Sequence, residues 1–100
     1  MNIQIHAHEF SASEQLVDFI RRKLTKLEQY YDHIIDAEVF LSLENKSSTV
    51  KDKASKIRLS IPGHQLIGSS ASKSFEDAID NAIDAIKTQL TRHKEKQKGQ

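Results

Sequence analysis

Cysteine is absent from the 100 residues of the chain. Disulfide bonds and zinc sites made of thiolates are therefore excluded. No apolar run approaches the roughly 20 residues that span a bilayer. The start, MNIQIHAHEF, lacks the basic segment and long apolar segment of a secretory signal. These absences favour a soluble, cytoplasmic protein that does not associate with membranes.

A strong charge of one sign is also absent, because 15 Lys and Arg residues oppose 14 Asp and Glu residues. A net charge of +1 is evidence neither for nor against binding to nucleic acid, so only the placement of the charges is informative. The sequence has no Gly-rich phosphate loop and no nucleophile motif. Asp77, Asp80 and Asp84 are better interpreted as an exposed acidic face than as acid–base groups. We expect no enzyme activity, no cofactor and no small-molecule substrate.

Apolar residues alternate with polar ones in three segments, which is typical of half-buried strands. These segments are 2–8, 35–43 and 56–61, and a weaker pattern predicts a short fourth strand over 66–71. In the second strand the inward set is Ile35, Ala37, Val39, Leu41 and Leu43, whereas Phe40 points outward. Pro62 and Gly63 predict a turn. The polar segment 45–53 is expected to be a mobile connection.

Two further segments repeat their apolar residues every three to four positions, as amphipathic helices do. The first has the capping-box spacing Ser11–Glu14, so a helix should begin near residue 12 and end near Tyr31. The second begins near Phe75, where Ser74 and Asp77 could form its cap.

The resulting order is β-α-β-β-β-α, in a chain whose length suits one domain. Each helix has one apolar stripe and each strand one apolar face. The simple solution is an α+β two-layer sandwich, with both helices packed on one face of a four-stranded sheet. We expect the domain to cover 1–95 and a flexible basic tail to cover 96–100.

Charge is divided along the second helix, which begins with acids and continues with Lys87, Arg92 and Lys94. The helix dipole favours this arrangement, so helix stability alone explains most of it. The first helix differs, because Arg22, Lys23 and Lys26 lie mid-helix, where the dipole gives no benefit. They are either a solvated face or, with the basic half of the second helix, a phosphate-binding surface.

The histidines give weaker signals. His6 and His8 are two residues apart on a strand and could chelate a metal, but no third ligand is evident, so exposed polar positions are the better interpretation. His33, His64 and His93 have no convincing catalytic partner in the sequence.

Three segments of the chain, in order, resemble the ribosome hibernation promoting factor family, also called protein Y or ribosome-associated inhibitor. They are MNIQIHAHEFSASEQLVDFI, KLTKLEQYYDHIIDAEVFLSLE and AIDNAIDAIKTQLTRHKEK. The last is the most specific, and its centre is Ala78-Ile79-Asp80 with Gln89-Leu90. The resemblance covers essentially the whole chain.

The resemblance implies a fold similar to double-stranded RNA-binding domains. It also implies binding to the ribosomal RNA of the small subunit near the decoding centre, where the family blocks the mRNA and tRNA sites and preserves idle ribosomes. Carried over to matching positions, the RNA-binding residues are Arg22, Lys23, Lys26, Lys87, Arg92, Lys94 and His8.

The chain departs from the family pattern at three positions of the second helix. Glu76 stands where the family often has tyrosine, and Ala85 and Thr88 stand where it often has cations. The chain also ends at residue 100, like the short type, which acts by occlusion or needs another factor to pair ribosomes. A general double-stranded RNA binder and a protein-interaction module that modulates a transcription factor stay open as alternatives.

Overall fold

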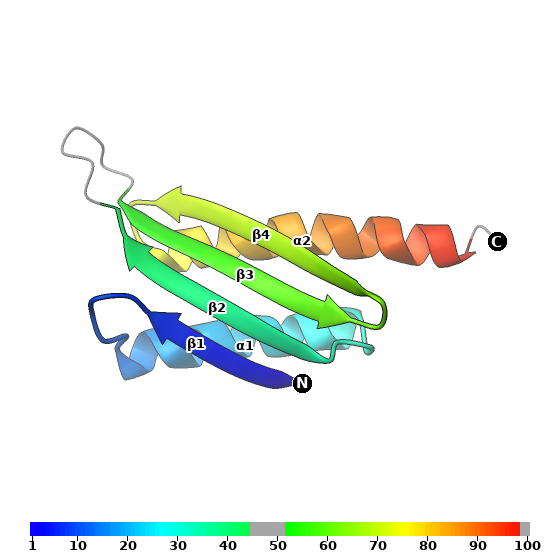
Figure 1. Cartoon of the computed structure of the whole chain (residues 1–100), viewed down its shortest axis with the longest axis horizontal. Coiled ribbons are helices and arrows are strands. Elements are labelled where there is room, and N and C mark those ends of the chain that lie inside the picture. Colours follow the sequence, from blue (N-terminus) through cyan, green and yellow to red (C-terminus); the bar gives the residue numbers. More distant parts are fainter. Residues whose placement is uncertain (45–51, 99–100) are drawn as a thin grey trace.

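The computed structural model describes residues 1–44 and 52–98, which form four strands and two helices (Figure 1). In chain order they are β1 (Asn2–Ala7), α1 (Glu14–Tyr30), β2 (Asp36–Leu43), β3 (Lys53–Ile61), β4 (His64–Ser72) and α2 (Phe75–Lys98). The predicted order β-α-β-β-β-α is therefore confirmed. Neither helix is long and apolar enough, within the described residues, to cross a membrane.

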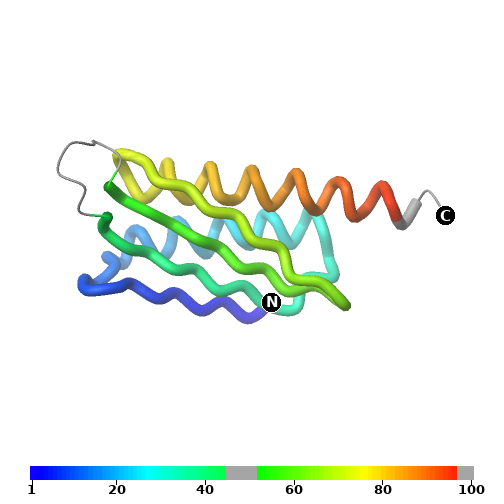
Figure 2. Tube along the Cα trace, turned by 45° about the horizontal axis from the view of Figure 1, so that its top comes forward, coloured from blue at the N-terminus to red at the C-terminus, as the bar shows by residue number. Residues whose placement is uncertain are grey.

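The strands form one sheet in the order β1-β2-β3-β4. β1 and β2 are parallel, with α1 as the connection between them, and the other neighbouring pairs are antiparallel. Figure 1 and Figure 2 show both helices on the same face of the sheet, side by side and running in the same direction. The predicted two-layer arrangement is confirmed, whereas the likeness to double-stranded RNA-binding domains stays a prediction.

The core lies between the sheet and the two helices. It contains the apolar stripes predicted for the helices and the inward faces of the central strands, including Ile20, Leu24, Val39, Leu59 and Leu90, each at most 1% exposed. The prediction that Ile35 and Leu43 point into the core is wrong, since their side chains are 56% and 50% exposed. Ile35 precedes β2 and Leu43 is its last residue. The alternation of apolar and polar residues extends to both positions, but neither side chain is buried. Phe40 points outward, as predicted, and is 38% exposed.

The start of α1 corrects the predicted cap. The backbone N–H of Leu16 donates to Ser13 Oγ at 3.1 Å, so Ser13 is the N-cap and the helix begins at Glu14. Ser11 has the matching spacing to Glu14, but it lies in the connection where the Phe10 ring stacks on Phe75 at 5.1 Å. The residues before Ser13 therefore belong to the connection that leads from β1 to α1. At α2 the predicted cap is confirmed, because Asp77 N–H donates to Ser74 Oγ at 3.1 Å.

Several strand boundaries also differ from the sequence prediction. β4 covers 64–72 and is longer than expected, and Lys53, predicted to be mobile, begins β3. Residues 45–51 of the predicted mobile connection lie outside the described residues. α2 continues to Lys98, and the flexible tail over 96–100 stays a prediction.

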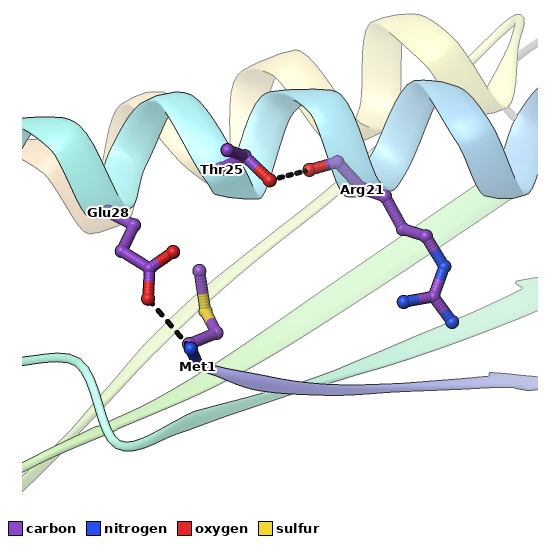
Figure 3. A network of polar contacts seen from close by, with 4 residues as sticks. All are labelled: Met1, Arg21, Thr25 and Glu28. Atoms are coloured by element: carbon purple, nitrogen blue, oxygen red, sulfur yellow. Dashed lines mark hydrogen bonds and ion pairs between the residues drawn. The ribbon is translucent and has the colours of Figure 1, made fainter.

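The start of β1 is tied to α1. The amino group of Met1 donates to Glu28 Oε2 at 2.7 Å, as Figure 3 shows. Arg21 lies on this β1 side of the helix, and its guanidinium extends toward the sheet layer (Figure 3). The opposite flank of α1 is the one that meets α2.

Candidate nucleic-acid interface

The line of contact between α1 and α2 gathers polar and basic side chains from both helices. We call it the inter-helix seam and define it by Lys23 and Tyr30 of α1 and Asp80, Lys87, Thr91 and Lys94 of α2. Lys23 and Tyr30 are seven residues apart and so lie on one flank of α1. Residues 80, 87, 91 and 94 follow the same spacing on α2, which explains why these side chains meet once the helices are parallel neighbours.

Tyr30 organises the basic end of the seam. Its ring centroid is 4.9 Å from Lys87 Nζ and 4.4 Å from Lys94 Nζ, two cation–π contacts on one ring. Its hydroxyl is 2.5 Å from the hydroxyl of Thr91, and its backbone carbonyl accepts from Lys94 at 3.4 Å. That carbonyl belongs to the last residue of α1, where the helix dipole attracts cations. Both ammonium groups are thereby held at the Tyr30 ring, and each has three donors, so they can also bind an anion.

The other end of the seam is acidic. Lys23 Nζ pairs with Asp80 Oδ1 at 3.0 Å, and both side chains are partly exposed. Glu76 and Asp77 are in the first turn of α2, where the dipole favours acids. The sequence predicted Lys23 as an RNA-binding residue, but in the structure Lys23 forms an ion pair with the carboxylate of Asp80. A phosphate at Lys23 therefore has to compete with Asp80.

A second basic surface lies on the outer side of α1. Arg22 and Lys26 are exposed, one turn apart, and with Phe19, Arg21, Lys23 and Thr25 they line a shallow hollow. Lys23 Nζ lies 5.3 Å from the ring centroid of the half-buried Phe19. Phe19 offers an aromatic face among cations, an arrangement that suits an unstacked base beside a phosphate.

Two of the predicted RNA-binding residues lie away from both the seam and the outer surface of α1. Arg92 is exposed, but it is two residues before Lys94 and therefore about 200° around the helix from it. β1 ends at the end of the molecule where α2 begins (Figure 1). His8 directly follows β1 and pairs with the neighbouring Glu9 at 3.3 Å. The structure thus gathers Lys87 and Lys94, pairs Lys23, exposes Arg22 and Lys26 nearby, and separates Arg92 and His8.

Sequence reasoning missed the aromatic and hydroxyl members of this surface, which are Phe19, Tyr30 and Thr91. The signal for the two aromatic residues was their position on the flank that also carries Lys23. No local pattern indicated Thr91, since its partner Tyr30 is 61 residues away. His6, considered as a metal ligand, pairs with Glu38 at 3.2 Å and stacks on Phe40, with ring centroids 5.0 Å apart.

A family model described as "Sigma 54 modulation protein / S30EA ribosomal protein" matches residues 3–98. The chain belongs to this family. It is similar to the "Ribosome hibernation promoting factor" of Salmonella typhimurium, with 35% identity over 98 residues that cover 98% of each chain. It is also 34% identical to the "Ribosome hibernation promotion factor" of Bacillus subtilis. In that case the chain spans only half of the relative's length.

Two solved structures support the S30EA-family fold. The N-terminal domain of Thermus thermophilus Protein Y matches with a TM-score of 0.79 and 28% identity, over 93% of this chain and 99% of that one. A ribosomal subunit interface protein from Coxiella burnetii matches with a TM-score of 0.83, over 94% and 98%. It is 20% identical and shows the fold alone. The predicted family is confirmed by the family model and by the similar sequences.

Proposed function

We propose that this protein is a ribosome hibernation factor that binds the small ribosomal subunit near the decoding centre. The family match over residues 3–98 and the names of the similar proteins support the association with ribosomes. The finer location, and the blocking of the mRNA and tRNA sites that preserves idle ribosomes, are our inference. The role is one of occupancy, with no reaction and no cofactor, and it would place the protein in the cytoplasm.

The observation that carries the proposal is the basic end of the inter-helix seam. Lys87 and Lys94 are held on the Tyr30 ring by contacts that the helix dipole of α2 alone does not require. Arg22 and Lys26 add two exposed cations on the neighbouring surface of α1. Together these four side chains can neutralise several backbone phosphates, which supplies affinity without sequence specificity.

The acidic half of α2 limits the extent of this contact. Asp80 forms an ion pair with Lys23, and Asp84 is exposed one turn further along α2. Glu76, Ala85 and Thr88 carry no positive charge either. RNA is therefore expected to lie along α1 and along α2 from Lys87 onward, while the first turns of α2 stay clear of phosphates. Shape and protein contacts would then select the site, since phosphate contacts alone do not.

The test is co-sedimentation of the purified protein with isolated small and large subunits across a salt series. We compare wild type with Arg22→Glu/Lys26→Glu and with Lys87→Glu/Lys94→Glu. The matched control is Lys56→Glu/Lys73→Glu, which changes the net charge equally at two exposed positions outside this surface. Each lysine or arginine that meets a phosphate should contribute about 1 to the slope of log affinity against log salt.

The expected result is binding to the small subunit that weakens with salt, loss of binding in both interface variants, and retention in the control. Circular dichroism verifies that all variants are folded. Equal binding by wild type and both interface variants would refute the assignment of this surface. Equal binding to free duplex RNA would favour the general double-stranded RNA binder instead.

A second candidate is favoured by one observation, namely that the family description also names sigma 54 modulation. Such a protein-interaction module would use a surface other than the lysines. The outer face of the sheet offers Phe40 beside a hollow lined by small residues such as Ser42, Ala54 and Ala71. Binding to a transcription factor that survives both interface variants, with no association with either subunit, would support this candidate.

A further inference from the structure

Three histidines from three different elements gather at one end of the molecule. His93 of α2 and His64 of β4 have ring centroids 5.0 Å apart. The Tyr31 ring contacts His93 at 6.1 Å and His33 at 5.6 Å. We call these three histidines the histidine cluster. They meet because the end of α1, the β3–β4 turn and the last third of α2 lie at the same end of the molecule (Figure 1, Figure 2).

The histidines of this chain divide into two groups by their partners. His6, His8 and His33 each lie near a carboxylate, at 3.2 Å from Glu38, 3.3 Å from Glu9 and 3.4 Å from Asp32 respectively. Within the part of the chain that the structure describes, no carboxylate lies at ion-pair distance from His64 or His93. Two adjacent imidazoles without an acid repel one another when both are charged, and an anion between them removes that repulsion.

The surroundings of the cluster favour such an anion. The titratable and charged groups on the elements around it are Tyr31, Asp32 and His33 after α1, His64 at the start of β4, and Arg92, Lys94, Glu95 and Lys96 on α2. Cations outnumber acids in this set even when the histidines are neutral.

The cluster directly continues the basic end of the inter-helix seam. Tyr31, which contacts His93, follows Tyr30, which holds the two lysines. His93 precedes Lys94 in α2. A phosphate backbone lying on Lys87 and Lys94 therefore reaches the histidines by continuing around the end of α2.

We propose that His64 and His93, with His33 at the margin, form a second phosphate-binding site for RNA that is occupied when the imidazoles are protonated. The inference rests on the proposed function and extends its surface to the β3–β4 turn. Histidine gains its proton between about pH 8 and pH 5. Because phosphate binds the charged form, the RNA-bound state holds these protons more tightly. Affinity therefore rises as pH falls, by at most about tenfold per pH unit for each proton taken up.

The test measures the affinity for isolated small subunits at about pH 6, 7 and 8 at constant ionic strength. We compare wild type with His64→Gln/His93→Gln and with His64→Gln alone, which changes only an exposed position. The control, His6→Gln, removes a histidine of β1 that lies on the exposed face of the sheet, opposite to the helices.

We expect wild type and control to bind about tenfold tighter at pH 6 than at pH 8. The double variant should lose this difference and bind at every pH as wild type does at pH 8. An unchanged pH response in the double variant would overturn the inference and leave the ribosome-binding proposal intact. No subunit binding at any pH, by contrast, would refute the proposed function itself.

A second readout separates the sources of phosphate. Ring-proton signals of His64 and His93 are followed by NMR during addition of inorganic phosphate, with chloride as the control, and of a short RNA hairpin. The RNA should move both signals at lower concentration than inorganic phosphate does. Signals that respond to inorganic phosphate but not to RNA would overturn the RNA assignment.

Discussion

Replacing Gly68 by alanine should shift the helix that carries the lysines. Gly68 is buried in β4 and points to the helix layer, where α2 crosses the strand. A Cβ atom at this position would lie 2.3 Å from the carbonyl oxygen of Ala82 and 3.0 Å from Cγ1 of Ile86. The nearer obstacle is backbone, so no side-chain rotation relieves the clash. α2 has to move by about 1 Å in a core that packs as densely as a crystal.

The expected loss in the free energy of unfolding follows from this displacement. Overpacking of a core costs about 1–3 kcal/mol, and a rigid helix backbone places this site at the upper end. Loss of glycine's freedom in the unfolded chain returns only about 0.4–1 kcal/mol. We therefore expect a net loss of about 2–3 kcal/mol. In a domain of this size that lowers the melting temperature by at least about 10 °C.

Urea denaturation and thermal melting followed by circular dichroism measure the loss. Ser69→Ala, at the next residue of β4, points to the other face and should stay within about 0.5 kcal/mol of wild type. Gly63→Ala tests backbone conformation instead, since φ is +78° there and the added Cβ meets no atom within 4 Å. A Gly68→Ala protein as stable as Ser69→Ala would refute the close approach of α2 to β4.

Three further predictions follow from named contacts. Ser13→Ala should lower the free energy of unfolding by about 1 kcal/mol through loss of the α1 cap, whereas Ser11→Ala should have little effect; equal losses in urea denaturation would contradict the corrected cap. Asp80→Asn should release Lys23, so the slope of log affinity against log salt should steepen by about 1, while the free energy of unfolding falls by less than about 1 kcal/mol. An unchanged slope in co-sedimentation would mean that Lys23 meets no phosphate. Phe40→Ser, on the outer sheet face, should leave small-subunit binding unchanged in the same assay, and loss of binding by the folded variant would move the interface to that face.

The candidate site was predictable from the sequence only in part. Arg22 and Lys26 were predicted to lie on a solvated face or on a phosphate-binding surface of the first helix, and both are exposed. Spacing within one helix could not reveal that Lys23 meets Asp80, because the pair depends on how α1 and α2 lie side by side. The same limit applies to Tyr30, whose partners Lys87, Thr91 and Lys94 all come from the other helix.

Local patterns also left some boundaries undecided. Ser11 and Ser13 both precede an apolar helical repeat, and only the hydrogen bond from the Leu16 N–H identifies Ser13 as the cap. Ile35 and Leu43 continue the alternation of β2, but alternation reports which side a residue points to and not whether a helix covers it.

By itself, the sequence determined the element types and order, because periods of 2 and 3.6 are local properties of the chain. It also determined membership of the S30EA family, through three segments in the right order. Only the tertiary structure decided which charges are free, which are paired and which histidines meet. The contacts of the inter-helix seam and the contact between His64 and His93 join residues separated by 29 to 64 positions. They form only when the sheet register and the neighbouring helices are in place.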